Sequence, residues 1–135
     1  MATGLILGIA LLLSFLYLSY KKDKEYKLLD DKVGKDGYTE LMAKSWANDI
    51  AGMQVLIKNG ADLNAQDHEG MTALMHSCIR SDGLSEDSVD ALEELITAGA
   101  DPNLRRLKGE RAVDLAYNLK HRKQVEFLEK YSDDS

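Results

Sequence analysis

The chain of 135 residues contains one cysteine, one proline and one tryptophan. Because Cys78 is alone, neither an internal disulfide nor a zinc site built from several cysteines can form. Basic residues are also in the minority, 17 against 23 acidic, and the net charge of −6 argues against a nucleic-acid-binding surface. The remainder, 44% hydrophobic and 30% charged, is typical of a folded protein. The length allows one small domain or a few repeats.

Charge is absent from residues 1–20, which form the longest apolar run of the chain. A helix over residues 2–20 would be roughly 28 Å long, close to the ~30 Å hydrocarbon core of a bilayer. We therefore expect residues 1–20 to form a transmembrane anchor that contacts the lipid bilayer through residues 2–20. A cleaved signal peptide is the competing interpretation. It is disfavoured because the first four residues lack a basic side chain and no Ala-x-Ala site precedes residue 21.

The charged residues that follow the apolar run predict its orientation. Lys21, Lys22, Lys24 and Lys27 lie on its C-terminal side, so the positive-inside rule favours a cytoplasmic location for the rest of the chain. A periplasmic or extracellular location stays open as the alternative. Residues 21–36 carry six basic and five acidic side chains. They are expected to form either a helix that caps the following domain or a solvated tether.

The remaining sequence contains an internal repeat. Three segments begin with glycine and a helix-start pattern, namely Gly37 (GYTELMAKS), Gly70 (GMTALMHSC) and Gly109 (GERAVDLAY). A second element recurs as NGADLN at 59–64 and AGADPN at 98–103. These residues resemble the ankyrin repeat, with its G-x-T-P-L-H and G-A-D-x-N elements. The resemblance implies an all-α solenoid of about three helix-turn-helix repeats at 37–69, 70–108 and 109–131, followed by an acidic tail at 132–135.

Local chemistry agrees with this pattern. Thr39 and Thr72 can cap helix N-termini, and Gly60 and Gly99 follow apolar helices where a positive φ is needed. Asn48 stands at a turn, where asparagine tolerates the left-handed conformation. The expected core contains eleven apolar residues: Leu41, Val55, Leu56, Leu74, Leu92, Leu95, Ile96, Val113, Leu115, Val125 and Leu128.

Several positions depart from the family pattern. Met42 and Met75 replace the family histidine, so its hydrogen bonds at the turn are expected to be lost. Gly52 lies inside a helix, at a cost of about 1 kcal/mol relative to alanine. The second repeat has extra residues within Ile79–Ser88, where Ser85 is a candidate helix cap. Sequence drift and a partner-contacting loop are both open for this insertion.

No residue pattern indicates catalysis. His68, His76 and His121 show no spacing typical of metal ligands, and no nucleophile or phosphate-loop motif is present. Cys78 occupies a position where the family has a small core residue, so we expect an inert thiol. We expect no enzyme activity, no catalytic, cofactor-binding or metal-binding residues, no nucleic acid and no small-molecule substrate.

The resemblance implies instead that another protein binds to the concave face. The family's contact positions correspond here to nine residues: Tyr38, Trp46, His68, Glu69, Met71, Ile79, Arg80, Leu107 and Lys108. Trp46 has two open interpretations, an interface anchor or a side chain folded back onto neighbouring segments.

The sequence therefore predicts a single-pass membrane protein whose ankyrin surface scaffolds or inhibits a partner. By analogy with compact membrane-anchored ankyrin proteins, it could be an immunity protein against a membrane-acting toxin or lipase. The alternative is an exported ankyrin protein with a chaperone-like or stress-protective role.

Overall fold

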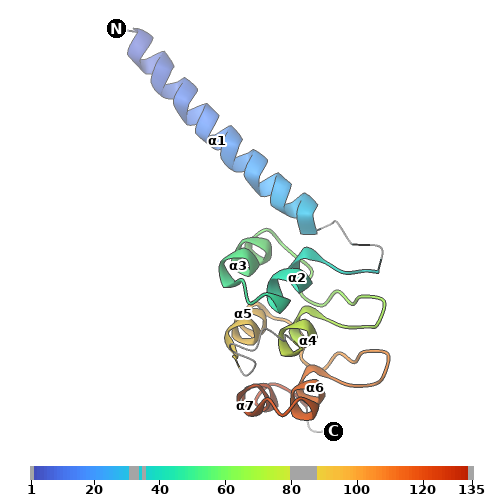
Figure 1. Ribbon diagram of the computed structural model, residues 1–135. Coiled ribbons are helices and arrows are strands. Elements are labelled where there is room, and N and C mark those ends of the chain that lie inside the picture. Colours follow the sequence, from blue (N-terminus) through green and yellow to red (C-terminus); the bar gives the residue numbers. More distant parts are fainter. Residues whose placement is uncertain (1, 31–33, 35, 80–87, 134–135) are drawn as a thin grey trace.

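A computed structural model describes residues 2–30, 34, 36–79 and 88–133 (Figure 1). Within these residues the chain forms seven helices and no strand, which confirms the all-α class. The helices are α1 (Ala2–Asp30), α2 (Glu40–Trp46), α3 (Ile50–Lys58), α4 (Ala73–Cys78), α5 (Asp90–Ala98), α6 (Ala112–Asn118) and α7 (Arg122–Glu129).

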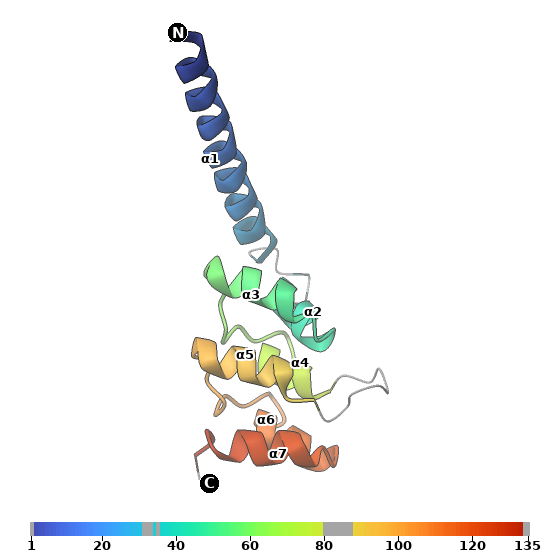
Figure 2. The same cartoon turned by 90° about the vertical axis from the view of Figure 1, so that its left-hand side faces the viewer.

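The six shorter helices stack as three antiparallel pairs (Figures 1 and 2). One layer contains α2, α4 and α6, in which each helix contacts the next, and the other contains α3, α5 and α7. The loops that connect successive pairs project to the same side (Figure 1). This is the arrangement that the repeat pattern predicts, with one helix pair in each repeat.

Helix α1 stands at the end of the stack nearest to the first pair, and contacts α2 and α3 (Figure 1). It continues from the apolar run to Asp30, so residues 21–30 are helical, as one of the two interpretations of this segment requires. Among the residues that the structure describes, no helix combines the length and apolarity required to cross a bilayer. The transmembrane anchor is therefore not confirmed.

The helix starts follow the sequence expectations, with one correction. The hydroxyls of Thr39 and Thr72 accept hydrogen bonds from the N–H groups of Met42 and Met75, at 3.2 and 3.4 Å. The expectation that the turn hydrogen bond is lost at Met42 is wrong, because the Met42 thioether Sδ accepts the Thr39 N–H at 3.4 Å. The Met42 sulfur therefore keeps a hydrogen bond at this turn.

The glycine inside α3 has a structural reason. Asp49 caps this helix, and its carboxylate Oδ1 accepts the Gly52 N–H at 3.0 Å. A Cβ atom at position 52 would lie 2.6 Å from Asp49 Oδ2. A side chain at this position would therefore force the capping carboxylate of Asp49 to move, and this offsets the lower helix propensity of glycine. Asn48, just before the cap, has the expected positive φ of 53°.

Backbone hydrogen bonds join each hairpin to its neighbour. The His68 N–H donates to the Asp36 carbonyl at 2.7 Å, and the Leu107 N–H donates to the Glu69 carbonyl at 2.9 Å. A side-chain contact between neighbouring repeats also recurs: Asn64 Oδ1 accepts the Asp101 N–H, and Asn103 Oδ1 accepts the Asp133 N–H, each at 2.8 Å. The two backbone bonds fix the hairpin tips relative to one another.

The core lies between the two helix layers. Eight of the eleven expected core residues are buried: Leu41, Leu56, Leu74, Leu92, Leu95, Val113, Leu115 and Leu128. The other three, Val55, Ile96 and Val125, are only partly buried. The predicted cap Ser85 lies outside the described residues. Helix α5 begins instead at Asp90, whose N–H donates to the Ser88 hydroxyl at 3.4 Å.

Candidate protein-binding surface

The hairpin tips bring five of the nine predicted contact residues to one side of the stack. We call Tyr38, His68, Glu69, Leu107 and Lys108 the hairpin surface. All five are exposed; the exposed fraction is 37% for Tyr38 and 80% for Leu107. Because the backbone bonds between tips involve His68, Leu107 and Glu69 themselves, the spacing of these side chains is held by the fold. A partner would meet a preorganised surface, which lowers the entropy cost of binding.

One predicted contact residue must be withdrawn. Met71 is only 4% exposed and belongs to the core, so a partner cannot reach it. The equivalent residues of the first and third repeats, Tyr38 and Glu110, are more accessible. Met71 differs because its repeat has a neighbour on both sides. Ile79 is also partly buried against the core, and Arg80 lies outside the described residues.

Trp46 lies at the end of α2 and is 46% exposed. It stands in register with Ile79 and Asn118, near the ends of α4 and α6. Half of its indole is therefore available for contact with another protein, which is compatible with the interface-anchor interpretation. A contact between Trp46 and the insertion at 80–87 lies outside what the structure describes.

Next to the hairpin surface, a buried polar network connects the first two repeats. His76 Nε2 lies 2.8 Å from Asp67 Oδ2, and Asp67 Oδ1 accepts the N–H groups of Glu69 and Met71, each at 2.9 Å. The Tyr38 ring packs edge-on against the His76 ring, with centroids 5.0 Å apart. This network holds both Tyr38 and Glu69 in place. Sequence inspection missed it because His76 and Asp67 are nine residues apart, a spacing that matches no metal or catalytic motif.

The electrostatics of this network follow from its contacts. Burial tends to raise the pKa of Asp67, but the two backbone N–H donors and His76 outweigh it and lower the pKa below its ordinary value. Burial, with the nearby carboxylates of Asp67 and Glu40, raises the pKa of Tyr38. Asp67 is therefore an ionised acceptor at neutral pH, and Tyr38 remains a neutral phenol.

The thiol has the environment of a structural cysteine. Cys78 is fully buried, and burial raises its pKa to about 12. A thiol with this pKa carries almost no thiolate at neutral pH and is a poor nucleophile. In the described part of the chain, no group of three or more histidine, cysteine, aspartate or glutamate side chains is arranged to hold a metal ion. The absence of catalysis stays a prediction.

Comparisons with known proteins agree with the repeats seen in the structure. One family model, described as ankyrin repeats in many copies, matches residues 41–85, and another, described as an ankyrin repeat, matches residues 69–107. A mitochondrial disaggregase from Bos taurus is 42% identical over 64 residues, which are 47% of this chain and 9% of that protein. An ankyrin repeat and LEM domain-containing protein 1 homolog from Caenorhabditis elegans is 28% identical over 95 residues, 70% of this chain and 12% of that protein. The chain thus spans about a tenth of the length of these relatives.

Proposed function

The chain belongs to the ankyrin repeat family, and from this premise we propose that it binds another protein through the hairpin surface together with Trp46. Ankyrin repeats are protein–protein interaction modules. The observation that carries the proposal is the backbone ladder, which places the exposed Tyr38 and Leu107 on one fixed surface. Exposed aromatic side chains on a rigid surface are typical anchors of an interface.

Site-directed photo-crosslinking tests where the partner binds. A photoreactive phenylalanine analogue in place of Leu107 should give a discrete polypeptide adduct in cells. The same analogue at Leu119, which is 44% exposed but lies at the turn between α6 and α7, should not. Trp46→Ala should weaken the binding of the identified partner by at least about tenfold, as expected for an interface anchor. Equal adducts from both positions, or binding unchanged by Trp46→Ala, would place the interface elsewhere.

We further propose that α1 holds the domain at a membrane. Large apolar side chains between Ile6 and Tyr20 are at least 50% exposed around the whole helix, and such a surface is unfavourable in water. The expected location of the repeats is the cytoplasmic side, because the lysines at 21–27 follow the apolar run. Leu12→Arg should shift the protein from the membrane fraction to the soluble fraction, since a central arginine costs about 2.5–3.5 kcal/mol of insertion free energy. Leu107→Arg is the matched control and should leave the distribution unchanged.

Confinement near a bilayer would raise the local concentration of a membrane-associated partner. The proposed role is therefore to scaffold or inhibit such a partner. A narrower version is immunity against a membrane-acting toxin or lipase. This narrower version is supported only if the crosslinked partner is a membrane-acting toxin or lipase and the purified ankyrin protein inhibits its activity.

The exported, chaperone-like alternative is tested by the mature N-terminus. Mass spectrometry of protein from its native host should find Met1 or Ala2 at the N-terminus if α1 is retained. A mature chain that starts near residue 20 would favour export and overturn the anchor.

A further inference from the structure

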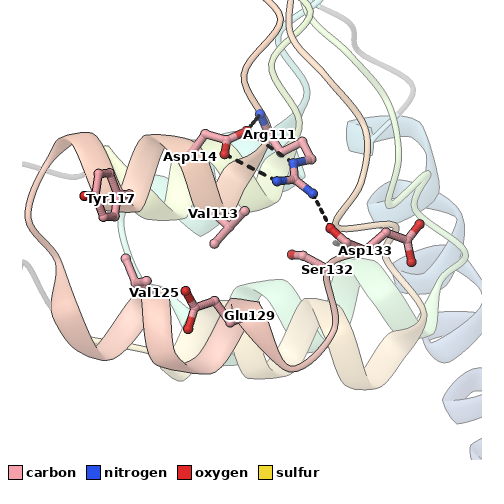
Figure 3. A pocket seen from close by; sticks show the side chains of 8 residues that line it. All are labelled: Arg111, Val113, Asp114, Tyr117, Val125, Glu129, Ser132 and Asp133. Atoms are coloured by element: carbon pink, nitrogen blue, oxygen red, sulfur yellow. Dashed lines mark hydrogen bonds and ion pairs between the residues drawn. The ribbon is translucent and has the colours of Figure 1, made fainter. Parts of the chain in front are cut away.

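A groove opens at the end of the stack, on the face of α6 and α7 away from the second repeat (Figure 3). Its volume is about 400 Å³. Val113 and Val125 line the centre of the groove, and Tyr117, which is 73% exposed, stands at the end opposite Ser132 and Asp133. Its lining is mixed. Val113, which is 7% exposed, and the partly buried Val125 lie among five polar side chains: Arg111, Asp114, Glu129, Ser132 and Asp133.

The repeat register shows what is unusual about this groove. The buried leucines Leu56, Leu95 and Leu128 are equivalent in α3, α5 and α7. The next residues are therefore also equivalent: Ile57, Ile96 and Glu129. Both isoleucines pack against the core, whereas the third repeat has a carboxylate at this position, exposed at the groove.

Two arginines near the groove, Arg111 and Arg122, already form hydrogen bonds with other groups. Arg111 is buried at 8% exposure, with its Nη1 donating to the Asp133 carbonyl at 2.7 Å and its Nε donating to Asp114 Oδ2 at 3.2 Å. Arg122, one turn before Val125, donates from Nε to Glu126 Oε1 at 2.9 Å. Glu129 has no hydrogen bond or ion pair within the described residues, and Figure 3 shows its carboxylate directed into the space between α6 and α7. The groove thus combines two valines with the Glu129 carboxylate, for which the described residues supply no cation, and the Asp133 carboxylate lies at one end of it.

We propose that this groove binds a lysine or arginine side chain presented by a partner polypeptide. The aliphatic part of such a side chain would contact Val113 and Val125, and its cation would pair with the Glu129 carboxylate. The exposed Tyr117 ring offers a further contact for a cation. The net negative charge of residues 37–135, which carry eleven basic and eighteen acidic side chains, would also attract a basic partner. That same net charge disfavours a second copy of this chain as the occupant. The proposal concerns a face separate from the hairpin surface and does not depend on it.

Methyl NMR of the full chain in a mild non-ionic detergent tests the proposal. The probes are the blocked tripeptides Ala-Lys-Ala and Ala-Arg-Ala, with Ala-norleucine-Ala as the uncharged control of similar length. The basic tripeptides should shift the Val113 and Val125 methyl signals in a saturable manner. Norleucine should bind at least about fivefold more weakly, because it retains the stem but lacks the charge.

Two variants separate the groove from general electrostatic attraction. Glu129→Gln should weaken binding of Ala-Lys-Ala by about fivefold, whereas Glu93→Gln, at an exposed position on α5, should leave it unchanged. Unchanged circular dichroism will show that both variants are folded.

Three results would overturn the proposal. The first is no saturable shift of the valine methyls, and the second is equal binding by wild type and Glu129→Gln. The third is self-association that shifts the same methyls without any peptide, because a second copy would then be the occupant.

Discussion

The carboxylate of Asp67 contributes to both stability and the shape of the binding surface. It is 6% exposed at the side chain and accepts two backbone N–H groups while it contacts His76. An asparagine side chain has one acceptor oxygen and no negative charge. It could not replace the contacts that the two carboxylate oxygens make with the two N–H groups and His76. We expect Asp67→Asn to lower the free energy of unfolding by about 1–3 kcal/mol at pH 7. Urea unfolding of the full chain in non-ionic detergent measures this difference.

The same substitution has a predicted pH dependence. The pKa of Asp67 in the folded protein is lowered, while an unfolded aspartate has a pKa of about 3.9. The stabilisation from ionised Asp67 is therefore complete above about pH 4 and is lost as the pH falls through the folded-state pKa. The difference between wild type and Asp67→Asn should shrink from pH 7 to pH 3. If the difference in unfolding free energy between the two proteins stays constant over this range, the network does not stabilise the ionised form of Asp67.

At the scale of elements, the hairpins depend on close backbone approach. Gly70 has a φ of +78°, and a Cβ atom there would lie 2.9 Å from the Leu107 backbone nitrogen and 3.0 Å from Arg106 Cα. Gly60 has a similar φ of +86°, but a Cβ atom there would have no neighbouring atom within 4 Å. A side chain at Gly60 would therefore cause backbone strain only. A side chain at Gly70 would cause the same strain and would also collide with the neighbouring hairpin.

Substitution of these glycines by alanine should give different losses of stability. Gly60→Ala should cost about 1 kcal/mol, the cost of a left-handed non-glycine residue. Gly70→Ala should cost at least about 2 kcal/mol, because the hairpin of the third repeat must also move. Urea unfolding measures both, and faster amide exchange at Leu107 should appear only in Gly70→Ala. Equal losses of unfolding free energy in the two variants would show that the close approach between hairpins does not add to the cost of Gly70→Ala.

The elements also show how far the sequence could predict the structure. The threonine caps of the first two repeats, the positive φ of Asn48 and the three helix pairs follow from local sequence patterns. The burial of Met71 could not be predicted in this way, because it depends on the repeats on either side. The network of Asp67 and His76, and the groove at Glu129, also arise from tertiary contacts. Residue order alone does not reveal which carboxylates are already paired.

For the molecule as a whole, three repeats are close to the minimum for a stable stack. Each helix pair packs against the neighbouring pair, so we expect all three to unfold together. Leu128 is fully buried in α7, and Leu128→Ala should cost about 2–5 kcal/mol.

The only tryptophan lies in the first repeat, so its emission reports on the end of the stack far from Leu128. The transition followed by Trp46 emission should shift to lower urea together with the transition followed by circular dichroism. A Trp46 transition that stays at the wild-type midpoint would mean that the first repeat is stable without the third.

The ends of the insertion in the second repeat are both held by residues outside it. Before it, the Ile79 N–H donates to the Met75 carbonyl at 3.3 Å. After it, the Ser88 carbonyl accepts a hydrogen bond from the buried Gln124 amide at 3.0 Å. A segment anchored in this way can change in length at little cost in free energy, since loop-closure entropy varies slowly with length. Residues 80–87 are thus a suitable place to insert an epitope or a fluorescent peptide when the protein is followed in living cells.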